Sequence, residues 1–303
     1  MKTARAALFA LVLPFALAAC QGDVKVHDTK TDEPSAKLVR GKIDDRIFRS
    51  AVSLKIRIAN VGTQVCSGTL IEKDLVLTAA HCVDGLISPL AGDEFSAYAT
   101  ARLLDYGEGR AFIAHPKYKD DPRRFDLALI RLELKSPADG QGVSDAIEIL
   151  RAEFKNPARI ARDWTPDAKQ NLLLTGSGIK AGYLEAPFEP PVGEAGKFQG
   201  RTQIDRAGTL TSIFDFFKTS SFKEGDLMEL SANESSPWLC AGDSGGGLYL
   251  ENADETLTIA GVNSRAKIYN FQGKNLCMPS GMIITPLGPH WGWIEDATAK
   301  LRK

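Results

Sequence analysis

The chain has 303 residues, of which 44% are hydrophobic and 25% charged, and its formal net charge is -1. This composition is ordinary for a globular protein of one large or two medium domains, and it argues against a fibrous or wholly disordered chain. The 37 basic and 38 acidic residues are spread along the sequence, without the concentrated positive charge that binding to phosphates requires. The composition therefore argues against a nucleic acid partner, and it does not identify any other kind of partner.

Residues 1–19 are predicted to be a secretory signal peptide. Lys2 and Arg5 precede an apolar run that is too short to cross a hydrocarbon core of about 30 Å. The run ends in LAAC, which resembles the lipobox of bacterial lipoproteins, whose cysteine is acylated and becomes the new N-terminus. This resemblance implies a lipid on Cys20 and a place in the cell envelope, at the outer membrane or the periplasmic face. An ordinary cleavable signal with an A-x-A-like site is the alternative.

Residues 20–37 are polar and lack a hydrophobic pattern, so they are predicted to be a tether or propeptide. Beyond Cys20 the chain keeps an even set of four cysteines, as expected in a compartment where disulfides persist. A zinc site is the weaker interpretation, because these cysteines are scattered and the four histidines form no HExxH motif. The set consists of Cys66, Cys82, Cys240 and Cys277.

From residue 38 onward the hydrophobic pattern is mostly that of short strands. Leu54, Ile56 and Ile58 alternate with basic residues, which predicts a half-buried strand. A hairpin turn is predicted at residues 252–254, a helix at 290–302 and a long exposed loop at 179–202. Further strands are predicted at 69–71, 75–77, 127–132, 172–174, 248–250 and 256–262.

Many short strands without strand–helix alternation predict an all-β fold, either a barrel or a sandwich. Three motifs in a fixed order carry the chemistry: TAAHC with His81, FDLALI with Asp126, and CAGDSGGG with Ser244. A serine hydroxyl is a poor nucleophile at neutral pH, so an imidazole must take its proton and return it to the leaving group. A buried carboxylate then holds the imidazole in the required tautomer.

Together these motifs resemble those of the chymotrypsin/trypsin family of serine proteases, from about residue 38 to the C-terminus. The resemblance implies a serine endopeptidase that needs no cofactor or metal, acts on protein or peptide substrates through an acyl-enzyme, and is a monomer. It implies two packed antiparallel β-barrels, at about 38–148 and 149–289, and a C-terminal helix. His81, Asp126 and Ser244 would form the triad, and the N–H groups of Gly242 and Ser244 would form the oxyanion hole. His115 and His290 are expected to be structural or surface residues, and His27 lies in the tether.

The resemblance also implies pairings and a substrate pocket. Cys66 would bond Cys82, and Cys240 would bond Cys277, so that both links brace the site. GVNSRA, at residues 261–266, resembles the strand that lines the pocket and pairs with the substrate backbone. Ser264 would support the catalytic Asp there, and Arg265 and Ala266 would line the pocket.

The sequence departs from trypsin where trypsin carries an Asp at the bottom of the pocket, six residues before the nucleophile. Trp238 stands at that position here, so a preference for Lys or Arg lacks its counter-charge. The indole would shorten the pocket toward small apolar side chains, unless a loop of different length makes the count misleading.

KLVRG, at residues 37–41, resembles the family's activation site. Cleavage of the Lys37–Leu38 bond would free an amino group that pairs with Asp243 and orders the oxyanion loop. Arg40 replaces the usual Gly. Because Cys20 lies upstream, the cut would also release the catalytic domain from its lipid. The alternative is an uncut lipoprotein that is always active.

Two other functions remain open. Gly242-x-Ser244-x-Gly246 also fits the nucleophile elbow of α/β-hydrolases, with Asp254 or Glu255 and then His290 in the order such an esterase needs. The strand-like segment after Ser244 argues against it, since an elbow leads into a helix. The second alternative is a catalytically silent binding protein on the protease fold.

Overall fold

The computed structural model describes residues 42–43, 50–58, 62–85, 96–101, 104–134, 157–164, 172–176, 183–184, 198–208, 223–231, 238–252, 256–271, 274–278 and 281–303. Residues 35–303 belong to one compact unit. Cys20 and the Lys37–Leu38 bond lie outside the described residues, as do the predicted signal peptide and tether. Among the helices in the described ranges, none is long and apolar enough to cross a membrane.

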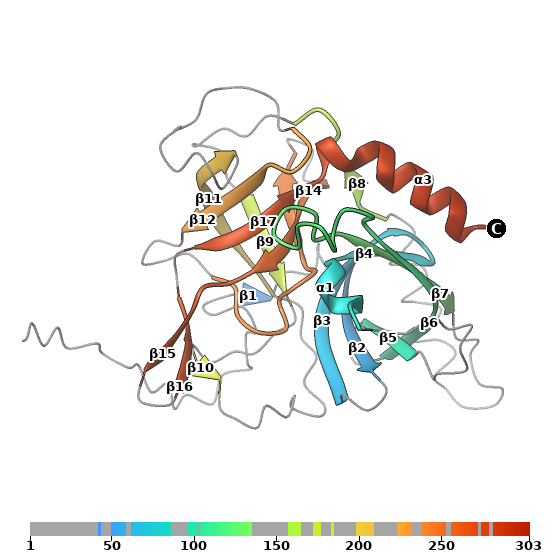
Figure 1. The fold of residues 1–303 in the computed structure, drawn as a ribbon, viewed down its shortest axis with the longest axis horizontal. Helices are drawn as coiled ribbons and strands as arrows, with labels where there is room; N and C mark the ends of the chain where they lie inside the picture. Colours follow the sequence, from blue (N-terminus) through green and yellow to red (C-terminus); the bar gives the residue numbers. More distant parts are fainter. Residues whose placement is uncertain are drawn as a thin grey trace, which may run out of the picture. The chain divides into compact units, whose positions relative to one another are not determined.

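Six antiparallel strands of the first half close into a barrel, in the order β2-β3-β4-β7-β6-β5 (Figure 1). Its strands are β2 (Ala51–Ile58), β3 (Gly62–Glu72), β4 (Leu75–Thr78), β5 (Ser96–Ala101), β6 (Leu104–Ala114) and β7 (Ala128–Leu134). In β2, Leu54 and Ile56 are fully buried and Lys55 between them is exposed, as the alternation in the sequence predicts. In β2, one face of the strand thus fills the barrel interior.

The second half forms an eight-stranded sheet, in the order β1-β11-β12-β17-β14-β13-β9, with β8 paired to β14. Because β9 pairs with β11 as well as with β13, strands β9, β11, β12, β17, β14 and β13 form a closed ring, which is the second barrel. All pairings are antiparallel except that of β8 with β14. The strands are β1 (Lys42–Ile43), β8 (Arg159–Ile160), β9 (Leu172–Gly176), β11 (Phe198–Gly208), β12 (Leu227–Ser231), β13 (Gly247–Glu251), β14 (Leu257–Arg265) and β17 (Met282–Pro286).

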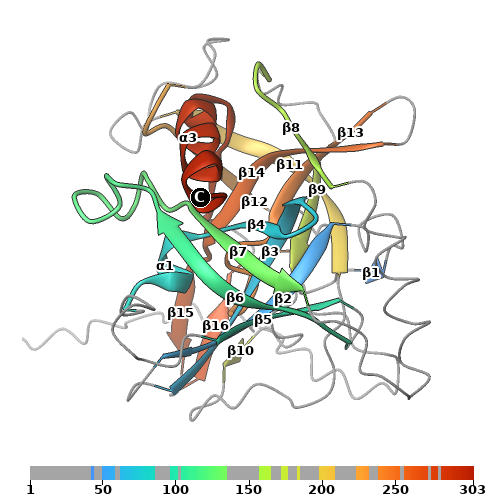
Figure 2. The ribbon, with the colours of Figure 1, turned by 90° about the vertical axis from the view of Figure 1, so that its right-hand side faces the viewer.

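Three short strands form a separate sheet: β10 (Tyr183–Leu184), β15 (Ile268–Phe271) and β16 (Lys274–Cys277). The helices in the described ranges are α1 (Ala80–Val83), a 3-10 turn at Gly288–His290, and α3 (Trp291–Leu301). Figure 2 views the molecule from the side of the first barrel, with β6 and β7 toward the reader. The guanidinium of Arg131 in β7 donates to the carbonyl of Leu301 at 2.7 Å, so the end of α3 is fastened to the first barrel.

The fold confirms the all-β prediction and the C-terminal helix, and it corrects two assignments. Residues 42–43 were expected in the first barrel, but as β1 they pair with β11 of the second sheet. The predicted loop at 179–202 contains β10 and the first residues of β11. The sequence of β11, FQGRTQIDRAG, does not alternate apolar and polar residues. This segment is a strand because it forms hydrogen bonds with β9 and β12.

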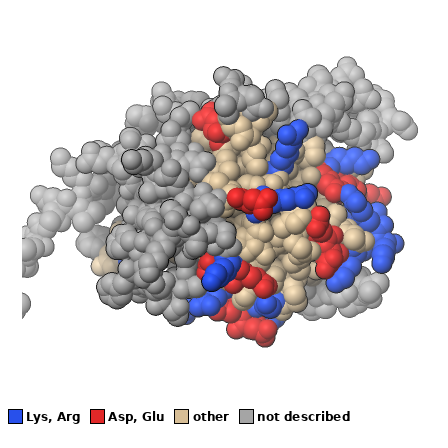
Figure 3. Space-filling view, turned by 90° about the horizontal axis from the view of Figure 1, so that it is seen from above, with Lys and Arg blue, Asp and Glu red and all other residues tan. Residues whose placement is uncertain are grey.

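The surface carries charges of both signs. On the face in Figure 3, Lys and Arg side chains lie beside Asp and Glu side chains and do not gather into one patch. Among the described residues, oppositely charged side chains also pair across the chain, as in the contacts of Arg110 with Glu133 and of Arg302 with Glu72. Such exposed pairs contribute roughly 0–1 kcal/mol each, so the fold depends mainly on its two interiors.

Candidate active site

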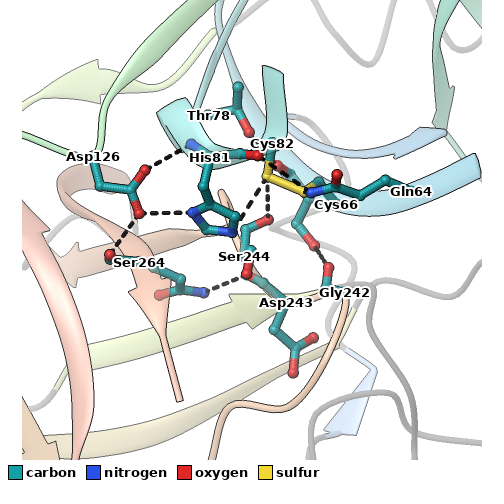
Figure 4. The surroundings of a disulfide bond; sticks show 12 residues. Gln64, Cys66, Thr78, His81, Cys82, Asp126, Gly242, Asp243, Ser244 and Ser264 are labelled. Carbon is teal, nitrogen blue, oxygen red and sulfur yellow. Dashed lines mark hydrogen bonds and ion pairs between the residues drawn. A yellow bond between two sulfur atoms is a disulfide. The ribbon is translucent and has the colours of Figure 1, made fainter. Parts of the chain in front are cut away.

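His81 and Asp126 both come from the first barrel and lie side by side (Figure 4). His81 is in α1, directly after β4, and Asp126 precedes β7, which pairs with β4. Nδ1 of His81 lies 2.7 Å from Oδ2 of Asp126, and the backbone N–H of His81 donates to Oδ1 at 2.9 Å. The Asp126 side chain is 1% exposed and that of His81 is 31% exposed. The carboxylate therefore fixes the imidazole from the buried side and leaves Nε2 on the other edge.

Ser264, from β14 in the second sheet, gives Asp126 a third hydrogen bond. Its Oγ donates to Oδ2 at 2.6 Å, and Ser264 is itself 1% exposed. Hydrogen bonds to an ionised group are roughly twice as strong as neutral ones. The carboxylate is thus held from both halves of the molecule.

Ser244 lies in a tight turn that leads into β13. Gly242 and Gly245 in this turn have φ values of 88° and 83°, a region that residues with a Cβ rarely adopt. A Cβ on Gly245 would lie 2.1 Å from Oγ1 of Thr78 and 2.2 Å from the carbonyl oxygen of Ser67. Glycine at this position serves both the backbone conformation and the close approach of the two barrels.

The turn approaches the imidazole next to a disulfide. Sγ of Cys82 lies 3.9 Å from Nε2 of His81 and 3.8 Å from the carbonyl oxygen of Ser244. In Figure 4, Ser244 lies beside the imidazole edge that faces away from Asp126. The structure therefore brings all three motifs of the sequence together, although they are far apart along the chain.

Strand β3 of the first barrel holds the Ser244 turn by two hydrogen bonds. The backbone N–H of Ser67 donates to the carbonyl of Ser244 at 2.7 Å, and its Oγ donates to the carbonyl of Gly242 at 2.8 Å. Nearby, Oγ1 of Thr69 lies 2.9 Å from the buried hydroxyl of Tyr249. This support was not predicted, since Ser67 and Thr69 look like ordinary strand residues in the sequence.

Asn263 supports the same turn from the second sheet, and it too was missed. Its backbone exchanges hydrogen bonds of 2.8 Å with the Gly245 N–H and the Gly246 carbonyl. Its side-chain amide donates to the carbonyls of Thr175 at 2.7 Å and Asp243 at 3.2 Å. Asn263 directly precedes Ser264, so one segment of β14 positions both the turn and the Asp126 carboxylate.

The two N–H groups expected in the oxyanion hole belong to this turn. In the described part of the chain, the N–H groups of Gly242 and Ser244 have no hydrogen-bond acceptor, whereas those of Asp243, Gly245 and Gly246 do. Gly242 is buried and Ser244 is partly exposed. Donors free of protein acceptors at the edge of a fixed turn are what a developing oxyanion needs.

Both expected disulfides are present, Cys66–Cys82 and Cys240–Cys277, with sequence separations of 16 and 37. The first joins β3 to α1, and the second joins the start of the Ser244 turn to the end of β16. Closing loops of these lengths stabilises a fold by roughly 3 to 4 kcal/mol in the chain-entropy model. The bonded cysteines offer no thiolate, so the group of Cys66, His81 and Cys82 is not a metal site.

The residues expected at the substrate pocket have different surroundings. Trp238 is partly buried, packs against the Cys240–Cys277 bond, and donates from Nε1 to the carbonyl of Cys277 at 3.0 Å. Ala266 and Trp238 pack against the same apolar cluster of the second sheet. Arg265 is exposed and donates to the carbonyl of Pro122, in the loop before Asp126, at 2.8 Å.

Asp243, expected to pair with a new N-terminus, is completely buried. Its Oδ2 accepts the backbone N–H of Cys240 at 2.8 Å. A Cβ on Gly176 would lie 2.0 Å from its Oδ1, so the strand beside the carboxylate has room only for glycine. Leu38, the expected partner, lies outside the described residues.

His115 and His290 are buried, 3% and 1% exposed, and burial lowers the pKa of each to about 4. Both are therefore neutral at neutral pH. Their rings lie 5.0 Å apart, and the ring of His115 stacks on that of Phe125, which precedes Asp126. The hydrogen bond from Lys117 holds the pKa of nearby Glu224 below its usual value.

The esterase alternative does not agree with the fold. A nucleophile elbow requires a strand, a turn and a helix, whereas Ser244 is followed by strand β13 within an almost wholly antiparallel sheet. Asp254 and Glu255, the acids of that alternative, lie outside the described residues.

Comparison with known proteins finds a family-model match to part of the chain, and relatives that include the following three. Residues 43–179 match the family model described as Trypsin. The chain is 23% identical over 273 residues to Chymotrypsin of Phaedon cochleariae, a match that covers 87% of this chain and 83% of that protein. It is 35% identical over 78 residues to Serine protease 28 of Mus musculus, covering 24% and 27%. It is 28% identical over 210 residues to Serine proteinase stubble of Drosophila melanogaster, covering 67% of this chain and 24% of that protein.

Proposed function

We propose that this chain is a serine endopeptidase with a triad of Ser244, His81 and Asp126. The match to the Trypsin family model and the similarity to serine proteases support a trypsin-like serine peptidase. One observation carries the proposal: the buried Asp126 fixes His81 with two hydrogen bonds, and the glycine-flanked Ser244 turn is clamped beside that imidazole. A silent binding protein would have no need of this arrangement.

In the proposed reaction, Oγ of Ser244 attacks the scissile carbonyl while Nε2 of His81 takes its proton. The N–H groups of Gly242 and Ser244 donate to the oxyanion of the tetrahedral intermediate. His81 then gives the proton to the leaving amine, which leaves an acyl-enzyme on Ser244. Water attacks the acyl-enzyme in a second round with the same groups, and Asp126 stabilises the imidazolium in both rounds.

The test is labelling with a fluorophosphonate, together with turnover of peptide and ester substrates. We expect the label on Ser244, with peptide turnover lowered roughly 10⁶-fold by Ser244→Ala, because the triad acts as a unit. The matched control is Ser50→Ala, which removes a buried serine hydroxyl from the turn directly before β2. This variant should still react with the fluorophosphonate. Peptidase activity that survives in the Ser244→Ala protein would overturn the assignment.

Activation is proposed to follow cleavage of the Lys37–Leu38 bond, after which the freed amino group pairs with Asp243. The position of Asp243 supports this, because its carboxylate is buried directly before Ser244, where pairing with an amino group would act on the oxyanion turn. Breaking such a buried pair costs roughly 3 to 5 kcal/mol, enough to keep an uncut precursor mostly inactive. N-terminal sequencing of the active species should find Leu38. Full activity in acylated protein that begins at Cys20 would exclude the cleavage and favour the uncut lipoprotein.

We propose that the uncut protein is a lipoprotein of the cell envelope, because the LAAC motif that ends at Cys20 resembles a lipobox. A lipid on Cys20 would hold the precursor at the membrane, and the cut after Lys37 would release a monomeric peptidase. Cys20→Ser should move the uncut protein from the membrane fraction to the soluble fraction. Unchanged membrane association of that variant would contradict the lipid anchor.

A further inference from the structure

Three metal-binding side chains from distant parts of the chain converge beside the Asp126 loop. His115 follows β6, Glu224 lies in the turn before β12, and His290 ends the 3-10 turn before α3. Each offers one ligand atom, and these atoms all lie within 4.8 Å of one another. Nε2 of His115 and Oε1 of Glu224 are 3.9 Å apart.

His290 makes this cluster more than a chance meeting of polar residues. It is 1% exposed, and neither of its ring nitrogens has a hydrogen-bond partner in the part of the chain that the structure describes. Leaving a buried donor or acceptor unpaired is unfavourable, because the group loses its hydrogen bonds to water without replacing them. A ligand that takes the free imidazole lone pair would remove part of this cost.

We propose that His115, Glu224 and His290 bind a divalent transition-metal ion, for which Zn²⁺ is the best match. Two imidazoles and one carboxylate are a ligand set that Zn²⁺ takes in sites where water completes the shell. Nε2 of His115 faces Glu224 and is the ligand atom, while Nδ1 accepts the backbone N–H of Lys117 at 3.3 Å. Binding moves the ring proton to Nδ1 and gives up that long hydrogen bond.

Closing the site requires a modest movement, and Glu224 can make it. Zn–N and Zn–O bonds of about 2.1 Å in a tetrahedron separate ligand atoms by about 3.4 Å. The widest pair must therefore approach by up to about 1.4 Å, measured against the 4.8 Å limit. The side chain of Glu224 is 46% exposed and free to move toward the two buried imidazoles.

Lys117 opposes the ion in the present arrangement. Its Nζ lies 3.0 Å from Oε1 of Glu224, and its side chain is 52% exposed, so it can leave when a cation arrives. Loss of such an exposed ion pair costs little, because water solvates both charges once they separate. This competition gives the proposal a signature that a merely structural cluster would lack, because removal of Lys117 should strengthen metal binding.

The experiment is calorimetric titration of Zn²⁺ into the full-length Ser244→Ala protein, so that the result does not depend on peptidase activity. We expect one ion per chain and a higher unfolding temperature in its presence. Glu224→Gln should weaken binding by about 100-fold, as should His290→Gln, whose folding is checked by its unfolding transition. Lys117→Gln should tighten binding by roughly two- to fivefold.

Glu295→Gln, which neutralises an exposed carboxylate on α3, is the control and should leave the affinity unchanged. Co²⁺ in place of Zn²⁺ should give visible absorption bands that Glu224→Gln abolishes. The proposal is overturned if no ion binds, or if Glu224→Gln leaves the affinity unchanged, which would put the ion elsewhere, for instance on His81.

Discussion

Ser264→Ala removes a side-chain hydrogen bond that Asp126 receives from the second sheet. Ser264 Oγ donates to Oδ2 at 2.6 Å, and both residues are 1% exposed, so the bond is buried and charge-assisted. A hydrogen bond to a charged group contributes about 1.5 to 3 kcal/mol. The two donors from His81 remain in the variant. We therefore expect the free energy of unfolding to fall by about 1.5 to 3 kcal/mol, with the fold retained.

Thr285→Val is the matched control, because it removes a hydroxyl of equal burial from the neighbouring strand. Thr285 lies in β17, which pairs with β14, and it is 0% exposed. Its Oγ1 has no hydrogen-bond partner among the described residues. Since no bond is lost and an unsatisfied oxygen is removed, the free energy of unfolding should stay the same or rise.

Urea unfolding followed by tryptophan fluorescence measures both variants, in the Ser244→Ala background to prevent self-cleavage. In active protein, Ser264→Ala should lower kcat by roughly tenfold, which corresponds to about 1.4 kcal/mol, with KM little changed. Equal losses of stability in the Ser264 and Thr285 variants would refute the reasoning, because the loss would then reflect packing and not the bond to Asp126.

Three further substitutions test other parts of the site. Gly176→Ala should lower the free energy of unfolding by roughly 1 to 3 kcal/mol, because the new Cβ would lie 2.0 Å from Asp243. In the control Gly292→Ala, in α3, the new Cβ meets nothing within 4 Å, so the same urea titration should show no change or a slight gain in stability. Trp238→Gly should admit larger side chains before the scissile bond, and an unchanged cleavage-site profile would put the indole outside the pocket. Tyr249→Phe should cost roughly 0.5 to 1.5 kcal/mol. Because burial raises the pKa of Tyr249 above 10.0, the native protein should lose stability as pH rises past 10.0, and the Phe variant should lose less.

The sequence predicts the parts of this fold whose signal is local. The alternation of apolar and basic residues within β2 is enough to predict a strand, and the amphipathic pattern at the end of the chain is enough to predict a helix. The structure has strand β2 and helix α3 at these positions. Strand β11 escaped prediction because its residues alternate poorly, and its hydrogen bonds to β9 and β12 leave no signal within residues 198–208. Pairing partners override weak local preference in such a strand.

The candidate site divides in the same way. The three motifs could be found because the chemistry demands particular residue types, His81 and Ser244 above all. Ser67 and Asn263 could not be found, because they act through backbone carbonyls and through contacts between barrels that no short segment reveals. The cluster of His115 and Glu224 was hidden for a similar reason: its members are separated by more than a hundred residues and meet only in the folded chain.

Docking of the two halves and assembly of the proposed triad are one event. His81 and Asp126 belong to the first barrel and Ser244 to the second, and the hydrogen bonds that join the halves at this point are those that hold the site. Ser67 reaches from β3 to the Ser244 turn, and Ser264 reaches from β14 to Asp126, so each half positions a group of the other. Neither barrel can carry the geometry alone. A change that loosens the contact between barrels must therefore disturb the Ser244 turn and the Asp126 carboxylate together. A side chain at Gly245 would be such a change, because its Cβ would lie 2.1 Å from Oγ1 of Thr78 in the first barrel.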